Sequence, residues 1–194
     1  MREAGPPRVR GSAPLRVPPI PTTRALLRPV RYNDAAGIAA GLGDREVARW
    51  LAHVPHPYRI GDARTWIASV AMGAEAGDEA TFAVEIDGAL AGIIGLHGLR
   101  LDPTLGYWLA RSHWGRGVMG EAVGAALAWA FATLPIAGIR SGVFEGNAAS
   151  LRIQQRLGFR IVRRGPQPSL ALGRDLVHIE TFLARGEFTG ACQT

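Results

Sequence analysis

The stretch between residues 105 and 162 alternates strand and helix patterns, and this alternation limits the possible folds of the chain more than any other feature. Strands separated by helices are predicted in the order 105–110, 118–133, 139–144, 147–157 and 159–162. Two strands joined by a helix cross over and run parallel in one sheet. The chain is therefore expected to form a mixed α/β fold, with one sheet and helices packed on it.

The sequence before this stretch predicts an antiparallel meander. Asp87-Gly88 is a strong hairpin signal between two apolar strand patterns. Pro29 confines the first strand to an edge or a strand end. The remaining strands are predicted over 24–30, 81–86, 89–96 and 174–183, and helices begin at Asn33 or Asp34, at Asp44 and at Asp62. We expect residues 23–188 to form a single domain, followed by a tail over 189–194.

The N-terminal segment, residues 1–22, differs from the rest of the chain in charge and proline content. Residues 1–31 hold seven arginines against Glu3, whereas the other 163 residues carry 15 arginines and 15 acidic residues. Prolines exclude a helix or a central strand here, so we expect residues 1–22 to be extended or disordered, and dispensable for the fold. A nucleic-acid arm would interleave aromatic residues that stack on bases, and these are missing. We therefore expect a solvated tail.

Composition excludes several classes of protein. All 22 basic residues are arginine, which excludes a Schiff-base lysine and a phosphate loop built on lysine. The single cysteine, Cys192, excludes a disulfide framework and a multi-cysteine metal site. No run approaches about 18 apolar residues, and the first residues lack the apolar segment of a signal peptide. We therefore expect a cytoplasmic protein that does not bind membranes.

A glycine-rich turn, Trp114-Gly-Arg-Gly117, joins the strand at 105–110 to the helix at 118–133. Its glycines permit unusual backbone angles, and the free N–H groups of the helix start point back at the turn. Such a turn can bind an anion, and a pyrophosphate fits it well. Taken alone, the pattern is more typical of a tight turn, since it matches neither a Walker loop nor the dinucleotide motif.

A second motif lies in the predicted helix at 147–157. Asn147 begins the helix, Ser150 follows one turn later, and Gly158 ends it. In isolation Asn147 is typical of a simple N-cap. Positions 147 and 150 share a helix face, however, so both side chains can address one ligand.

Together these motifs resemble the GNAT acyl-CoA-dependent N-acyltransferases, in the branch of the RimJ/RimL-type ribosomal-protein N-terminal acetyltransferases. The resemblance rests on Gly106-Tyr-Trp-Leu-Ala110, Trp114-Gly-Arg-Gly117 with Glu121, and Asn147-x-x-Ser150 through Phe159, and it covers about 23–188. It implies the GNAT fold, a mixed sheet with splayed central strands, and acetyl-CoA as the co-substrate.

The resemblance also implies the site residues. The pantetheine arm of acetyl-CoA is expected beside Trp108, Leu109, Ala110 and Arg111. The pyrophosphate is expected on the turn formed by Gly115, Arg116, Gly117, Val118, Met119 and Gly120. Asn147 is expected to bind the pantetheine arm, Arg116 and Arg152 to add charge toward the phosphates, and Ser150 to protonate the leaving thiolate. Gln154 stands where many relatives carry a tyrosine acid, which supports Ser150 as the proton donor.

The base that removes a proton from the amine is open between Glu85, His97, Glu145 and His178. Each of them, taken alone, is more typical of a solvated or structurally bonded side chain than of a base. His97 ranks first, because its strand should end near the thioester and an imidazole titrates near neutral pH. No cluster of residues has metal-ligand spacing, so no metal is expected.

The sequence therefore predicts an enzyme that transfers an acetyl group from acetyl-CoA directly to a primary amine. The acceptor is open between a protein N-terminus, a polyamine, an amino acid and an aminoglycoside. A non-catalytic acyl-CoA sensor and a nucleic-acid-binding accessory protein are the alternatives from other classes. The oligomeric state is open, with a homodimer as one alternative.

Overall fold

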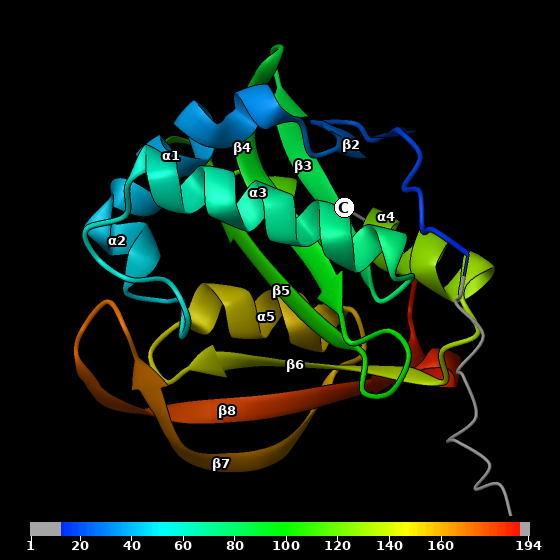
Figure 1. Cartoon of the computed structure of the whole chain (residues 1–194). Coiled ribbons are helices and arrows are strands. Elements are labelled where there is room, and N and C mark those ends of the chain that lie inside the picture. The colour runs from blue at the N-terminus through cyan, green and yellow to red at the C-terminus, as the bar shows by residue number, and fades with distance from the viewer. Residues whose placement is uncertain (1–12, 191–194) are drawn as a thin grey trace, which may run out of the picture.

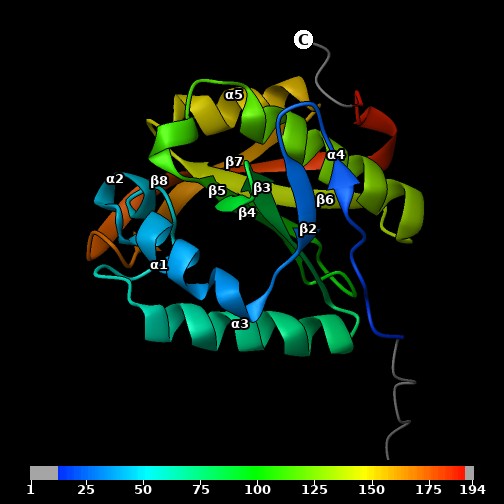
Figure 2. The ribbon, with the colours of Figure 1, turned by 90° about the horizontal axis from the view of Figure 1, so that it is seen from above.

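The computed structural model describes residues 13–190, which form one eight-stranded sheet with helices on both faces (Figure 1, Figure 2). The strands are β1 (Ile20–Pro21), β2 (Leu26–Pro29), β3 (Glu79–Ile86), β4 (Ala89–His97), β5 (Thr104–Leu109), β6 (Gly138–Phe144), β7 (Arg160–Ser169) and β8 (Arg174–Ala184). The α-helices are α1 (Ala35–Gly43), α2 (Arg45–Ala48), α3 (Ile60–Glu75), α4 (Val118–Thr133) and α5 (Ala148–Arg156). Short 3₁₀ turns are η1 (Tyr32–Asp34), η2 (Arg111–His113) and η3 (Arg185–Glu187).

The strands follow the order β1-β2-β3-β4-β5-β6-β8-β7 across the sheet. The first five form an antiparallel meander, in which Asp87 and Gly88 both take positive φ, as a two-residue hairpin turn requires. α4 carries the chain across to β6, which runs parallel to β5. β8 then inserts between β6 and β7 and is antiparallel to both. The predicted mixed α/β fold is confirmed, with the parallel pairing confined to β5 and β6.

The two faces of the sheet carry different helices. α1 and α3 cover one face, and α4 and α5 cover the other (Figure 2). The larger core lies between the sheet and α4, where Phe82, Ile94 and Leu127 are fully buried. α4 is apolar almost all round, and its many alanines let it pack closely on the strands. A smaller core around Ile38 and Ile93 lies under α1 and α3.

A buried ion cluster ties the start of the domain to the sheet. Arg28 on β2 is 4% exposed, donates to both carboxylate oxygens of Asp34 at 2.7 and 2.8 Å, and pairs with Glu85 on β3. Burial would raise the pKa of Asp34, but the hydrogen bonds from Arg28 and the Arg31 amide outweigh it and hold that pKa below its usual value. The Asp34 carboxylate therefore binds Arg28 instead of capping α1, which has no side-chain cap at its start.

Residues 13–22, expected to be extended or disordered, are extended and pack against the domain. β1 pairs with β2, the Leu15 amide donates to Ala74 O at 2.8 Å, and Leu15, Val17 and Ile20 contact the larger core. These contacts predict that residues 13–22 stabilise the domain, contrary to the expectation that all of residues 1–22 are dispensable for the fold. Residues 1–12 and Cys192 lie outside the described residues, and the limits 23–188 and 189–194 remain predictions.

Two element boundaries also differ from expectation. β7 runs on to Ser169, well beyond the predicted end at residue 162, because it is an edge strand where Pro166 and Pro168 cost no ladder hydrogen bond. α3 begins at Ile60 instead of Asp62, and the Asp62 carboxylate accepts a hydrogen bond from the Arg59 amide at 2.8 Å. Asp62 thus caps the helix from inside its first turn.

Candidate active site

A large cavity opens where β5 and β6 part. These strands share one paired position, Thr104 with Arg140, and the Arg140 amide donates to Pro103 O at 2.8 Å. The Ser141 hydroxyl adds a bridge to Leu105 O at 2.9 Å. Beyond these bonds the two strands diverge (Figure 1), and a cavity of about 2060 Å³ lies in the wedge between them. The splayed central strands implied by the resemblance are therefore present.

The glycine-rich turn forms one mouth of this cavity. Gly115 and Gly117 take φ values of 74° and 75°, where residues other than glycine are strained. Gly117 is the N-cap of α4, and no side chain caps this helix start. The first amides of a 16-residue helix are therefore available to an anion, with the helix dipole behind them. The cavity lining includes Gly115, Gly117, Val118, Met119 and Gly120.

Arg24 adds a positive charge at this turn that the sequence did not suggest. Its Cζ lies 4.0 Å from the position that a Cβ on Gly117 would take, and its Nη1 pairs with Glu121 Oε2 at 2.5 Å. Burial acts to raise the pKa of Glu121, but the hydrogen bonds from Arg24 and the neighbouring backbone lower it overall. Glu121 lies in the first turn of α4, four residues after Gly117, and thus holds Arg24 beside the glycine-rich turn.

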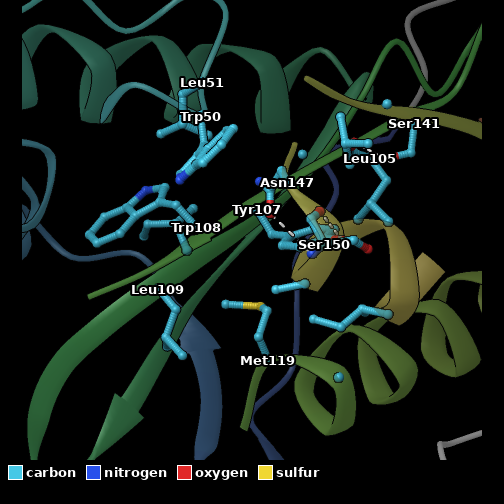
Figure 3. Close-up of a pocket in the computed structure, with 18 of the residues that line it drawn as sticks. Trp50, Leu51, Leu105, Tyr107, Trp108, Leu109, Met119, Ser141, Asn147 and Ser150 are labelled. Carbon is cyan, nitrogen blue, oxygen red and sulfur yellow. Dashed lines mark hydrogen bonds between the residues drawn. The ribbon is translucent and has the colours of Figure 1, made fainter. Parts of the chain in front are cut away.

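On the opposite wall, Asn147 and Ser150 come together as predicted. The Asn147 side chain caps α5 by accepting from the Ser150 amide at 3.1 Å. The Ser150 hydroxyl lies 2.7 Å from the hydroxyl of Tyr107 on β5 (Figure 3). Burial raises the pKa of Tyr107, so the phenol keeps its proton and can donate it to Ser150. Tyr107 lies in the motif Gly106-Tyr-Trp-Leu-Ala110, but the periodicity of a strand does not reveal that its hydroxyl meets Ser150 across the wedge.

Gln154, at the position where many relatives carry a tyrosine acid, has a structural role. Its side chain is fully buried, accepts from the Thr181 hydroxyl at 2.8 Å and donates to Ser141 Oγ at 3.0 Å. It therefore ties α5 to β6 and β8 behind the cavity, and through Ser141 to Leu105 on β5.

Two of the four residues predicted beside the pantetheine arm line the cavity, and the role of all four stays a prediction. Trp108 and Leu109 line the cavity, and the Trp114 indole donates to Leu109 O at 2.7 Å. The Ala110 amide instead donates to Ala91 O in the β4 ladder, and Arg111 pairs with Asp44 at 2.8 Å. Neither of these two residues lines the cavity, nor does Arg116 on the exposed side of the turn. Arg152 on α5 does line it.

The four candidate bases are separated by the structure. Glu85 is bound to Arg28, and Glu145 pairs with Arg164 at 3.0 Å away from the cavity lining. His97 and His178 both line the cavity. Burial lowers the pKa of His178, so this imidazole is neutral near pH 7.

The side of the cavity that faces α1 and α3 is aromatic. Trp50, Leu51 and Trp108 lie together to one side of Tyr107 and Ser150 (Figure 3), and Tyr58 and Trp66 also belong to the lining. The three carboxylates of the described lining are each within ion-pair distance of an arginine: Asp102 with Arg140, Glu121 with Arg24, and Glu180 with Arg163. This arrangement suits an apolar molecule better than a polycation.

Within residues 13–190, no group of three or more histidine, cysteine, aspartate or glutamate side chains is placed to hold a metal ion. No helix in that same range is long and apolar enough to cross a membrane.

Comparison with known proteins agrees with the fold. Residues 24–160 match the family described as an acetyltransferase (GNAT) domain. YoaA of Bacillus subtilis (strain 168), an uncharacterized N-acetyltransferase, is 28% identical over 152 residues, which cover 74% of this chain and 83% of that protein.

Two solved structures share the architecture. Mycobacterium smegmatis RimJ in complex with CoA-disulfide is 22% identical, with a TM-score of 0.75, and the match covers 87% of this chain and 85% of that one. The ribosomal-protein-S5-alanine acetyltransferase of Vibrio fischeri is 17% identical, with a TM-score of 0.77, over 89% of this chain and 100% of that one. At these identities, the likeness bears on the fold alone.

Proposed function

The chain belongs to the GNAT family of acetyltransferases, and we propose that it transfers an acetyl group directly from acetyl-CoA to a primary amine within the β5–β6 wedge. One observation carries this proposal above the others: the wedge has an uncapped helix start at its mouth and the Ser150–Tyr107 hydroxyl pair inside it. The first feature suits a pyrophosphate, and the second suits a leaving thiolate.

Different residues around the mouth of the cavity bind different parts of CoA. The backbone amides of 115–120 receive the pyrophosphate, while Arg24 and Arg152 add charge toward the phosphates. Trp108 and Leu109 flank the pantetheine arm, and Asn147 contacts that arm from the start of α5. Ala110, Arg111 and Arg116, which the resemblance implied, have no part in this assignment.

The chemistry requires a donor and an acceptor of protons. The free amine attacks the thioester carbonyl, the C–S bond breaks, and Ser150 gives its hydroxyl proton to the CoA thiolate. Tyr107, at 2.7 Å, restores the proton on Ser150, and the proton that the nitrogen releases as the amide forms returns to Tyr107 through solvent. His97 takes a proton from the acceptor ammonium before attack. No step forms an acyl-enzyme.

The aromatic side of the cavity receives the acceptor. The three carboxylates of the described cavity lining are paired with arginines, so we expect an acceptor with an apolar or aromatic group near the amine to react better than a polyamine. All of these residues come from one chain, so the proposal does not require the homodimer that the sequence left open. We place the reaction in the cytoplasm.

The test is CoA release from acetyl-CoA in the presence of an amine panel, with the acetylated amine identified by mass spectrometry. The panel includes 2-phenylethylamine, spermidine, an aminoglycoside and short peptides with free N-termini. Acetylated product from at least one amine supports the proposal. CoA binding by calorimetry without product from any amine would instead identify a sensor.

A further inference from the structure

Three glycines on neighbouring strands leave a bare patch of sheet on the face covered by α1 and α3. Gly95 on β4 is in register with Gly106 on β5. The single β5–β6 pair joins Thr104 to Arg140, and Gly106 and Gly142 each lie two residues further along their strands. Because side chains alternate between the faces of a sheet, these two glycines share one face. A Cβ on Gly106 would meet open space, and all three glycines line the cavity.

The imidazole of His97 leans over this patch. His97 is on the same face of β4 as Gly95, and a Cβ added to Gly95 would collide with Nε2 of the His97 ring. Glycine at position 95 is thus what allows the ring to lie along the strand toward the open space at Gly106. The His97 side chain is 44% exposed, so Nε2 can be reached from the cavity.

The other ring nitrogen of His97 faces the carboxylate of Glu79, which also accepts a hydrogen bond from a hydroxyl. Glu79 is in register with His97 on β3, and its Oε1 lies 3.3 Å from Nδ1. The Thr81 hydroxyl donates to the same oxygen at 2.8 Å. Gly73 on α3 leaves room for Oε2, since a Cβ there would approach that oxygen to 2.5 Å. Glu79 is 14% exposed and is not part of the cavity lining, so it sits behind the imidazole.

A carboxylate fixed beside Nδ1 selects the tautomer that carries its proton on Nδ1, which leaves the lone pair of Nε2 free. The charges of Asp102 and Arg140 in the cavity lining compensate one another, because these two side chains pair at 2.9 Å. Glu79 is therefore the carboxylate that acts on this ring. Buried acidic partners of this kind orient a histidine and stabilise its protonated form without taking the proton themselves.

We propose that Glu79 is a positioning residue that holds His97 with Nε2 unprotonated, so that Nε2 takes a proton from the acceptor amine over Gly95 and Gly106. This inference rests on the proposed acetyl transfer. The acceptor ammonium loses two protons in forming the amide. One passes to Nε2 of His97 and then to solvent. The other leaves the nitrogen as the amide forms and replaces, through solvent, the proton that Tyr107 and Ser150 pass to the thiolate.

His178 is the competing base. Its ring leans over Gly142 in the same manner, on the far side of the wedge. It packs edge-to-face with Phe144 at 5.7 Å between ring centroids, and Glu180 on its own strand faces Arg163. Among the described residues, His97 is the histidine with a carboxylate at ion-pair distance, which is why we favour it.

The first test reads the tautomer directly, without any turnover. Long-range ¹H–¹⁵N correlation spectra of the whole protein, with His97 assigned through His97→Gln, report which ring nitrogen carries the proton. We expect Nδ1 protonated and Nε2 bare in the wild type, and loss of this preference in Glu79→Gln. A wild-type His97 that is protonated on Nε2 overturns the proposal.

The second test compares two amines of one shape, 2-phenylethylamine and its 2,2-difluoro analogue, of which only the analogue is largely unprotonated at neutral pH. We expect His97→Gln to lower turnover of the first amine by about 10²-fold and Glu79→Gln by about 10-fold, with smaller losses for the second amine. Affinity for CoA should not change. Glu145→Gln, a carboxylate paired with Arg164 outside the cavity, is the matched control and should leave both rates unaltered.

Equal losses for both amines would indicate a structural defect and overturn the assignment of His97 as the base. A large loss in His178→Gln with none in His97→Gln would move the role to His178. If the wild type acetylates no amine at all, the proposed function fails instead, and the tautomer still decides whether Glu79 positions His97.

Discussion

Replacement of Ser150 by alanine should slow acetyl transfer without weakening the binding of acetyl-CoA. Two of the three hydrogen bonds at Ser150 use its backbone: its amide donates to Asn147 Oδ1 at 3.1 Å, and its carbonyl accepts from the Tyr107 hydroxyl at 3.3 Å. Ser150→Ala therefore removes the hydroxyl and leaves the start of α5 in place. Loss of a proton donor costs about 10²-fold in turnover, which corresponds to about 2.7 kcal/mol.

A double-mutant cycle with Tyr107→Phe tests whether the two hydroxyls act as one unit. If Tyr107 works through Ser150, the double variant should be no slower than Ser150→Ala alone. Steady-state rates of CoA release give the measurement, and Ser69→Ala on the exposed side of α3 is the matched control. A higher Michaelis constant for acetyl-CoA with unchanged turnover would reduce Ser150 to a binding or capping residue. Additive losses would refute the relay.

Three further predictions concern the arm, the turn and the buried ion cluster. Removal of residues 1–12 should leave urea unfolding unchanged, whereas removal of 1–22 should cost about 2–4 kcal/mol, because three half-buried aliphatic side chains leave the core; equal stabilities would contradict this. Gly117→Asp should weaken CoA binding by calorimetry at least about 10-fold relative to Gly117→Asn, because both side chains tolerate positive φ and only aspartate repels the pyrophosphate; equal affinities would remove the turn from the site. Asp34→Asn should lose about 3 kcal/mol at neutral pH. Since the folded pKa of Asp34 is lowered, the wild type keeps this extra stability above the unfolded pKa of about 3.9 and loses it as the pH falls through the folded pKa. A stability difference between the two proteins that does not change with pH during acid unfolding would contradict this prediction.

Local sequence patterns predicted correctly the elements that depend on residues close together in the chain. The limits predicted for α4 agree with the structure to the residue, because Gly117 before the helix and Pro135 after it are strong signals, and the Asp87-Gly88 turn fixed its hairpin. The same logic failed at β7, since whether Pro166 and Pro168 are tolerated depends on the strand lying at the sheet edge. It failed again at residues 13–22, where spaced aliphatic residues among prolines find a core that local sequence does not reveal.

The site shows the same division. The turn at 115–120 and the Asn147–Ser150 pair are contiguous in sequence, and the resemblance assigned both. Arg24, Tyr107 and Glu79 reach the site across strands that are distant in the chain, at 4.0 Å from the Gly117 Cβ position, 2.7 Å from Ser150 and 3.3 Å from His97. Sheet order and register bring them there, and no periodicity in one sequence encodes that order.

The most direct test of acetyl transfer in the β5–β6 wedge is the simultaneous measurement of released CoA and acetylated amine from the wild type, from Gly117→Asp and from Ser150→Ala. We predict equal amounts of CoA and acetylated amine from the wild type, weakened CoA binding in Gly117→Asp, and retained binding with slow turnover in Ser150→Ala. Acetylated product formed at the wild-type rate by both variants would place the reaction outside the wedge and contradict the account.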